Sequence, residues 1–360
     1  MCRARVRTVA TSPNPATGGR LPSAVVTTVL FTCAGQRVDI VSAFRRAGAR
    51  TVAVDADPLA PALYHAHERA IVPRVDDAGY LPALQALVRG HGVRLVIPLA
   101  DLDHLLLAER RTDLDGALVL LPAPEVVRRT EDKYEAHLFF EANGIPSPAS
   151  WLPDELPEDL PYPVLVKPRR GFGSRHIYRA DDPEALEFHL GHTPADSFVQ
   201  EVCAGEEFSI DVFCDFEGRC LGAIPRTMIE SKGGESIKGS SIKDEPLIEF
   251  GRLVAETLPI WGPANIQCFR VSDDRHEVTD VNPRFGGGFP LPLAAGGRYP
   301  ELALALARGE RPEPRLGDFR EGVTMTRFFS DLCLSAGSGG TLEPFSEDLP
   351  EPVASEPGEP

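Results

Sequence analysis

The chain opens with two β-branched segments on either side of a helical one. Residues 25–31 read Val-Val-Thr-Thr-Val-Leu-Phe, and residues 51–55 read Thr-Val-Ala-Val-Asp. Between them, residues 38–47 have the apolar spacing of an amphipathic helix, which Gly48 ends. A strand, a crossover helix and a second strand of this kind pair in parallel with a right-handed connection. The opening therefore predicts a Rossmann-like α/β domain.

The first turn of this domain does not favour a nicotinamide cofactor. A dinucleotide-binding turn carries three spaced glycines between the first strand and helix. Here residues 32–36 contain only Gly35, although Asp55 stands where a ribose-binding acid would be expected. We therefore expect neither NAD nor NADP to bind.

Two acidic residues follow a later strand of the same domain. Residues 80–90 are predicted to form a helix and residues 93–98 a strand, with Asp101 and Asp103 just beyond it. Open α/β sheets bind ligands at this carboxyl edge. The same acids could instead be favourable charges at a helix N-terminus. Both interpretations stay open.

A second region places a lysine at the end of a strand. Residues 130–142 predict a helix capped by Thr130 or Asp132, and residues 163–168 predict a strand that contains Lys167. A glycine-containing loop, residues 169–174, follows directly. A point charge beside backbone N–H groups suits phosphate oxygens. Glycine loops of this kind are also common in hairpins.

The segment 277–288, Glu-Val-Thr-Asp-Val-Asn-Pro-Arg-Phe-Gly-Gly-Gly, predicts a strand that ends in a polar site. It is expected to form a hairpin with residues 264–271. Regular alternation would place Asp280 and Asn282 on one face together with Val278. Carboxylate and amide oxygens suit a hard cation such as Mg²⁺, and Arg284 suits an anion. The alternative is a polar strand end before a glycine turn.

Other segments complete the outline. Residues 198–202 and 206–213 predict strands and residues 247–258 a helix, whereas residues 231–241 are rich in Gly, Ser and Lys and predict a mobile loop. Residues 1–24 have a basic, Ser/Thr/Pro-rich composition and predict a disordered leader. Residues 335–360 predict an acidic, Pro/Gly-rich, solvated tail.

Composition narrows the function classes. The 360 residues carry a net charge of −16, which argues against a nucleic-acid surface. No apolar run reaches the length of a membrane span. The seven cysteines are scattered without a C-x-x-C motif, so we expect reduced thiols and a cytoplasmic protein.

Four groups of residues, taken in order, resemble the ATP-grasp superfamily, in particular the branch similar to the carbamoyl phosphate synthetase large chain. The resemblance covers residues 25–334. The groups are Asp132-Lys133 with Gly144-Ile145-Pro146, Val166-Lys167-Pro168 with its glycine loop, Gly205-Glu206-Glu207-Phe208-Ser209-Ile210-Asp211, and Asn265-Ile266-Gln267 with Asp280-Val281-Asn282-Pro283-Arg284.

The resemblance implies a Rossmann-like pre-ATP-grasp domain at 25–125 and a two-lobed ATP-grasp domain of mixed α/β and α+β structure at 126–334. The small lobe would span about 126–200 and the large lobe about 201–334. ATP would lie between the two lobes.

The resemblance also implies roles for individual residues. Phosphates would be bound by Lys133 and Lys167, under a lid that contains Gly171, Gly173 and Ser174. Glu201 and Val202 would lie beside adenine, and Glu207 would bind the ribose. Asp280 and Asn282 would bind Mg²⁺ or Mn²⁺, with Gln267 completing or flanking the site. Arg284 would neutralise the transferring phosphoryl group, and Lys238 would reach that group or a substrate carboxylate.

Two residues depart from the family pattern. Many members have an acid where this chain has Gln267, which implies a weaker metal site. Asp280 stands where Glu is more common, and its shorter side chain favours coordination through one oxygen.

The activity implied is that of an ADP-forming carboxylate–amine ligase, which acts through an acyl phosphate on small molecules. One alternative is phosphorylation of bicarbonate or carbamate, as in the carbamoyl phosphate enzyme. Another is an ATP-binding regulatory protein without turnover. Arg226, Arg298 and Lys238 are the candidates for binding the carboxylate, and relatives of this type are often homodimers.

Overall fold

The N-terminal region folds around a parallel sheet of five strands. The computed structural model describes residues 26–171, 175–194, 196–232, 235–337 and 341–345. The strands run β3-β2-β1-β4-β5, all parallel. They are β1 (Thr28–Thr32), β2 (Arg50–Asp55), β3 (Glu68–Ile71), β4 (Leu95–Pro98) and β5 (Leu118–Val119). The predicted Rossmann-like domain is confirmed.

Alternation along β1 gives this sheet two buried faces. Val29 and Phe31 pack in the core that includes α1 (Val38–Arg46). Leu30 packs with α2 (Tyr80–His91) and α3 (His104–Glu109) in a separate core. The first of these cores continues into the rest of the chain, since the Phe44 and Phe285 rings lie 6.1 Å apart.

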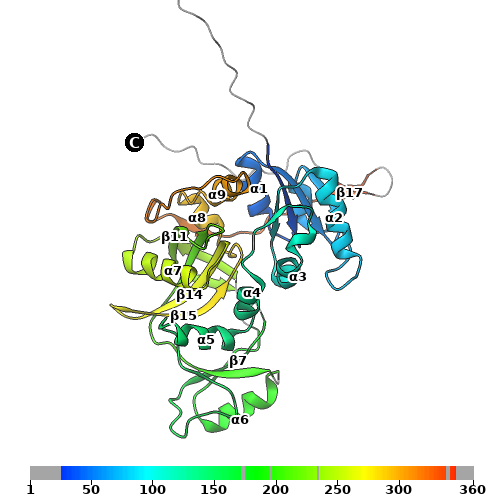
Figure 1. The fold of residues 1–360 in the computed structure, drawn as a ribbon. Coiled ribbons are helices and arrows are strands. Elements are labelled where there is room, and N and C mark those ends of the chain that lie inside the picture. The colour runs from blue at the N-terminus through cyan, green and yellow to red at the C-terminus, as the bar shows by residue number, and fades with distance from the viewer. Residues whose placement is uncertain (1–25, 172–174, 195, 233–234, 338–340, 346–360) are drawn as a thin grey trace, which may run out of the picture.

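Two helices connect this domain to a small antiparallel lobe. α4 (Pro124–Glu131) is followed at once by α5 (Lys133–Ala142). The lobe contains a sheet ordered β6-β9-β7-β8 and lies at the far end of the molecule from the N-terminal sheet (Figure 1). Its elements are β6 (Ser150–Trp151), β7 (Val164–Pro168), β8 (Tyr178–Ala180), α6 (Pro183–His192) and β9 (Ser197–Glu201).

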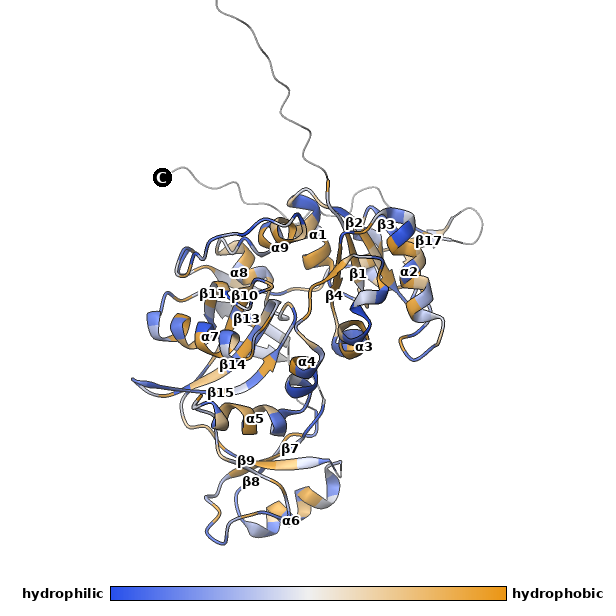
Figure 2. Ribbon diagram, in the orientation of Figure 1, coloured by the Kyte–Doolittle hydropathy of each residue, from blue (hydrophilic) through white to orange (hydrophobic). Residues whose placement is uncertain are grey.

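The large lobe is built on a second antiparallel sheet, ordered β11-β10-β14-β15. Its strands are β10 (Glu206–Cys214), β11 (Cys220–Thr227), β14 (Gly262–Ser272) and β15 (Arg275–Asn282), and α7 (Glu245–Thr257) packs on it. The β14–β15 hairpin projects beyond the sheet, and its tip is hydrophilic (Figure 2). The helices α8 (Pro290–Ala294) and α9 (Tyr299–Ala307) follow.

The prediction that Val278 shares a face of β15 with Asp280 and Asn282 is wrong, because the strand contains a β-bulge. Gln267 pairs with Asp280, but the next residue of β14, Cys268, pairs with Val278, so Thr279 is left as the extra residue. A bulge reverses the alternation on one side of it. Val278 and Val281 are therefore both buried, at 1% and 2% exposure. Asp280 and Asn282 still share a face, but Val278 does not join them.

The predicted loop at 231–241 is also different in the structure. β12 (Glu230–Lys232) and β13 (Glu235–Ser240) form a pair, and β16 (Thr324–Thr326) joins β13 as a third strand. Backbone pairing to a segment far along the chain compensates for the poor strand propensity of glycine and serine.

Part of the expected tail is ordered as well. β17 (Leu334–Ala336) and β18 (Leu342–Pro344) form a small hairpin. Arg69 on β3 donates to the Leu342 carbonyl at 2.9 Å and lies 2.8 Å from the Glu343 carboxylate, which holds the hairpin beside the N-terminal sheet. The expected leader, residues 1–24, lies outside the described residues.

In the part of the chain that the structure describes, no helix combines the length and apolar character needed to cross a bilayer.

Candidate functional site

Asp280 and Asn282 lie at the end of β15. A carboxylate oxygen of Asp280 contacts a lysine, and the amide oxygen of Asn282 contacts an arginine. Lys133 Nζ lies 3.0 Å from Asp280 Oδ1, and Asn282 Nδ2 donates to Asp280 Oδ2 at 2.9 Å. Arg284 Nη2 donates to Asn282 Oδ1 at 3.3 Å. The strand end thus gathers two cations around one carboxylate and one amide.

Lys133 is positioned by the residue that precedes it. Asp132 is buried and caps α5, accepting from the backbone N–H groups of Tyr134 and Glu135. It also binds Arg169 through two nitrogens, at 2.7–3.0 Å. The Lys133 N–H donates to the Arg169 carbonyl at 2.9 Å. Asp132 rather than Thr130 is therefore the cap, and it ties α5 to the loop after β7.

Lys167 projects from β7 into the same region from the small lobe. Its ammonium donates to Gln200 Oε1 at 2.6 Å, and Gln200 in turn donates to Ser150 Oγ at 3.0 Å. Burial lowers the pKa of Lys167 to about 8, with Asp280 raising it and Lys133 lowering it. An anion placed here would restore the charged form.

The remaining predicted ATP residues lie around this lysine or beyond the described chain. Glu207, on β10, is half-buried; burial raises its pKa, which Lys167 and Arg226 lower in part. Glu201 ends β9, where its N–H donates to the Ala149 carbonyl at 2.9 Å, and Val202 follows it. Gly171 follows β7 and is exposed. Gly173 and Ser174 lie outside the described residues.

Arg284 links this site to the N-terminal domain. Its guanidinium binds both oxygens of Asp101, with Nε at 2.7 Å and Nη2 at 3.2 Å. Burial opposes ionisation of Asp101, but Arg284 and His104 bring its pKa below the ordinary value. Asp101 thus lies beside Arg284 and also in the first turn of the short 3-10 helix Asp101–Asp103, so both of its expected roles stay predictions. Asp103 is instead fully buried and accepts from the Tyr80 hydroxyl at 2.7 Å, and it makes no side-chain cap to α3.

A small polar pocket opens beside Arg284. Its volume is about 50 Å³, room for a few water-sized groups. It is lined by Ser209, Arg226, Met228, Ser236, Asn265, Gln267, Asn282, Arg284, Gly287 and Gly288. Both arginines are lining residues, and no acidic side chain among the described residues lines this pocket; their carboxylate partners, Asp211 and Asp101, lie outside the lining.

Arg226 is fixed in the wall of this pocket although it is only 2% exposed. Its Nε binds Asp211 Oδ2 at 2.8 Å, and its Nη1 donates to Ser236 Oγ at 3.0 Å. Asn265 donates to the other Asp211 oxygen at 3.0 Å. A Cβ added to Gly288 would lie 2.5 Å from Arg226 Cζ, so only glycine lets the loop approach the guanidinium.

The three candidate carboxylate-binding residues separate in the structure. Arg226 lies in the polar pocket. Lys238, on β13, pairs with Glu230 at 2.6 Å and is half exposed. Arg298 precedes α9 and lines a different cavity. Only Arg226 is thus brought together with Arg284.

Three contributors were absent from the sequence-based candidates: Gln200, Arg169 and Asp211. Gln200 follows Phe198 and Val199 in β9, and a polar residue directly after two apolar strand residues is a usable signal; in the structure it is 4% exposed. Arg169 had no local signal, because its partner Asp132 lies 37 residues away. Asp211 ends one of the four groups that resemble the ATP-grasp superfamily but was given no role, because its partner Arg226 lies 15 residues away.

The oxygen atoms available at the end of β15 are too few to hold a hard cation alone, so a bound ligand would have to supply further oxygens. Among the described residues, no three His, Cys, Asp or Glu side chains gather into a metal site. Asp280 contributes one carboxylate, and Asn282 and Gln267 contribute amide oxygens; Gln267 pairs directly with Asp280 across the strands. Such a set suits Mg²⁺, which keeps most of its positions for phosphate and water.

Two family models match the chain. Residues 29–119 match the PylC-like N-terminal domain, and residues 193–328 match the model described as ATP-grasp in the biosynthetic pathway with Ter operon.

Solved structures share this fold. An L-amino acid ligase from Bacillus licheniformis is 18% identical with a TM-score of 0.65, over 82% of this chain and 77% of that one. N5-carboxyaminoimidazole ribonucleotide synthetase from Thermotoga maritima is 17% identical with a TM-score of 0.62, over 80% and 77%. Rhizobium etli pyruvate carboxylase is 14% identical with a TM-score of 0.66; the match covers 83% of this chain but only 30% of that longer one.

Proposed function

Because this chain belongs to the ATP-grasp superfamily, we propose that it is an ADP-forming carboxylate–amine ligase that acts through an acyl phosphate. The observation that carries the proposal is the meeting of Lys133, Lys167 and Arg284 around Asp280 and Asn282, beside a pocket that presents a second arginine.

The resting site holds its cations in internal ion pairs. Lys133 is paired with Asp280, and Arg284 with Asp101. In our proposal, ATP phosphates bind Lys133 and Lys167, which frees Asp280. Asp280, Asn282 and Gln267 would then hold Mg²⁺ or Mn²⁺, which neutralises charge on the β- and γ-phosphates. Glu207 would accept hydrogen bonds from the ribose, and Glu201 and Val202 would lie beside the adenine.

The polar pocket is proposed to bind the carboxylate substrate. Arg226 and Arg284 present charged donors, and a carboxylate is the anion whose shape matches a guanidinium. A carboxylate oxygen would attack the γ-phosphorus as the bond to the ADP oxygen breaks. The amine nitrogen would then attack the acyl carbon, phosphate would leave, and the nitrogen would lose a proton.

A screen for ADP release tests this proposal. The full chain is incubated with ATP and Mg²⁺, and with amino acids and small carboxylates supplied singly and in pairs. Products are identified by mass spectrometry, and hydroxylamine is added in a parallel arm to trap an acyl phosphate as a hydroxamate. We expect ADP, phosphate and an amide, and a hydroxamate in the trapped arm.

Other outcomes would replace the proposal. AMP and pyrophosphate would exclude the acyl phosphate route. ADP release driven by bicarbonate alone would favour bicarbonate phosphorylation. ATP binding without any ADP release would favour a regulatory protein. Asp280→Asn is the matched control that shows whether any ADP comes from this site.

A further inference from the structure

A second, much larger cavity lies between the start of α9 and the edge of the large sheet. Its volume is about 880 Å³, within the range of small-molecule sites. Its walls come from residues 221–224 of β11, residues 295–305 around α9, and residues 308–320 beyond it, with Ala47 of α1 at one side. We call it the α9 pocket. It shares no lining residue with the polar pocket beside Arg284.

The floor of the α9 pocket is apolar. Leu221, Ile224, Tyr299 and Phe319 are all at most 8% exposed, and their side chains form one continuous packed surface with the core of the large lobe. A ligand with an apolar portion would bury it here.

The rim is charged, and most of its charges are already paired. Arg308 pairs with Glu310, Arg315 with Asp318, and Glu313 with Arg219, at 2.5–3.4 Å. Paired groups of this kind contribute little net attraction for a ligand.

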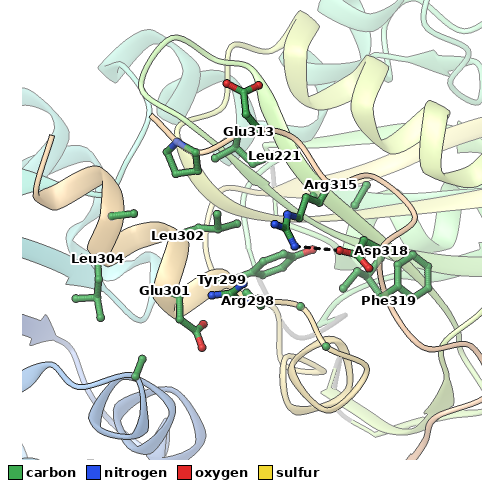
Figure 3. Close-up of a pocket in the computed structure, with 18 of the residues that line it drawn as sticks. Leu221, Arg298, Tyr299, Glu301, Leu302, Leu304, Glu313, Arg315, Asp318 and Phe319 are labelled. Atoms are coloured by element: carbon green, nitrogen blue, oxygen red, sulfur yellow. Dashed lines mark hydrogen bonds and ion pairs between the residues drawn. The ribbon is translucent and has the colours of Figure 1, made fainter. Parts of the chain in front are cut away.

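Two rim charges stand apart from this pattern. The Arg298 guanidinium and the Glu301 carboxylate make no hydrogen bond or ion pair with any other described residue, and both residues are exposed. Figure 3 shows both on the α9 side of the pocket, across from the Arg315–Asp318 pair. They are three residues apart, which places them on the same side of the first turn of α9.

From this juxtaposition we infer that the α9 pocket binds a small zwitterion of the α-amino acid class. Arg298 would bind its carboxylate and Glu301 its ammonium, while its side chain would lie on the apolar floor. An unpaired guanidinium and an unpaired carboxylate beside apolar surface match the three parts of such a molecule.

The α9 pocket has a direct mechanical link to the polar pocket. The Tyr299 hydroxyl donates to the Asp211 carbonyl at 2.6 Å, and the Asp211 side chain holds Arg226. The segment 315–320 also continues into β16, after Arg320 accepts from Ser241 Oγ at 2.8 Å. A ligand in the α9 pocket would therefore alter the position of Arg226, and with it the turnover.

Calorimetry with the full chain tests the site without using any activity. The probes are the common L-amino acids, each compared with its decarboxylated amine and its des-amino acid, in the absence of ATP. We expect at least one amino acid to bind with a Kd below about 1 mM, and both of its truncated analogues to bind at least about tenfold more weakly, because each loses one charged hydrogen bond.

Substitutions separate this site from the reaction site. Arg298→Ala and Glu301→Ala should each weaken binding of that amino acid about tenfold or more. Arg308→Ala removes the same charge from the same rim but from a group that is already paired, so binding should stay within about twofold. ADP release without the effector should be unchanged in all three variants.

Tyr299→Phe tests the link. Binding should stay near that of the unaltered chain, and the effect of the bound amino acid on turnover should be lost. The inference would be overturned if no amino acid binds at 5 mM, or if binding is equally strong in Arg298→Ala and Glu301→Ala. Because binding is measured without ATP, failure of the proposed ligase activity would not affect this result.

Discussion

Lys167 gives a quantitative prediction about proton uptake when nucleotide binds. Its ammonium is buried, and burial lowers its pKa to about 8 in the free protein. At pH 8 about half of the molecules therefore carry a neutral Lys167. A nucleotide phosphate favours the charged form, so binding must take up protons from solution.

The size of the uptake follows from the pKa. If the bound form is fully charged, Mg²⁺ and ADP should bind with uptake of about 0.1 proton at pH 7, about 0.5 at pH 8 and about 0.9 at pH 9. The sign follows because a lysine with a lowered pKa is neutral above that pKa and has a proton to gain. The affinity for ADP should fall in proportion to the fraction of Lys167 that is charged. At pH 9 it should be about tenfold weaker than when Lys167 is fully protonated.

Isothermal titration calorimetry in buffers of different ionisation enthalpy measures the proton number directly. ADP is the ligand of choice because its own phosphates are already deprotonated at pH 8–9. Lys167→Arg is the matched control, since a guanidinium stays charged throughout this range and uptake should vanish. Normal binding at pH 8.5 without uptake, or equal uptake in Lys167→Arg, would refute the assignment of Lys167 to the phosphates.

Three further substitutions address the rest of the proposed site. Asp280→Asn should lower ADP release by roughly 10²-fold or more, because it removes a charge that stabilises the reacting phosphates; steady-state turnover near that of the unaltered chain would remove Asp280 from the metal site. Gly288→Ala should raise the KM for the carboxylate substrate about tenfold and leave nucleotide affinity unchanged, because the added Cβ would lie 2.5 Å from Arg226 Cζ; an unaltered KM would place the carboxylate elsewhere. Lys238→Ala should lower turnover with acceptor present while ATP affinity stays the same, and equal turnover at saturating substrates would leave Lys238 as the exposed partner of Glu230.

Much of the fold could be predicted because its signals are local. The β1–α1–β2 unit, the Asp132 cap and the β14–β15 turn each depend on residues within a few positions of one another. The spacing of apolar residues and the presence of a helix-capping residue are both properties of neighbouring positions, so they can be recognised in a single sequence.

The errors came from contacts that join distant segments. Residues 235–240 form a strand because β16, more than eighty residues later, supplies hydrogen-bond partners. The Thr279 bulge has no local sequence signature, since it depends on how β15 aligns with β14.

The sequence predicted which residues gather at the candidate site, but not which side chains pair with one another there. Lys133, Lys167, Asp280, Asn282 and Arg284 do gather in one region. Their partners could not be read from the sequence, because the bond between Asp101 and Arg284 spans 183 residues. The roles of these residues in catalysis stay predictions.

The β14–β15 hairpin contains a second irregularity that complements the first. Thr279 is the extra residue on β15, and Val271 is left without a partner on β14, where Arg270 pairs with His276 and Ser272 with Arg275. One extra residue on each strand restores the original alignment at the turn. Between the two bulges, residues 268–270 of β14 pair with residues 276–278 of β15, three residues on each strand. This paired segment lies closer to the turn than Asp280 and Asn282. Insertions and deletions at the tip, residues 273–274, can change the length of the hairpin without shifting the pairing of Asp280 with Gln267. Divergence among related chains should accordingly accumulate at the tip and stop at the first bulge.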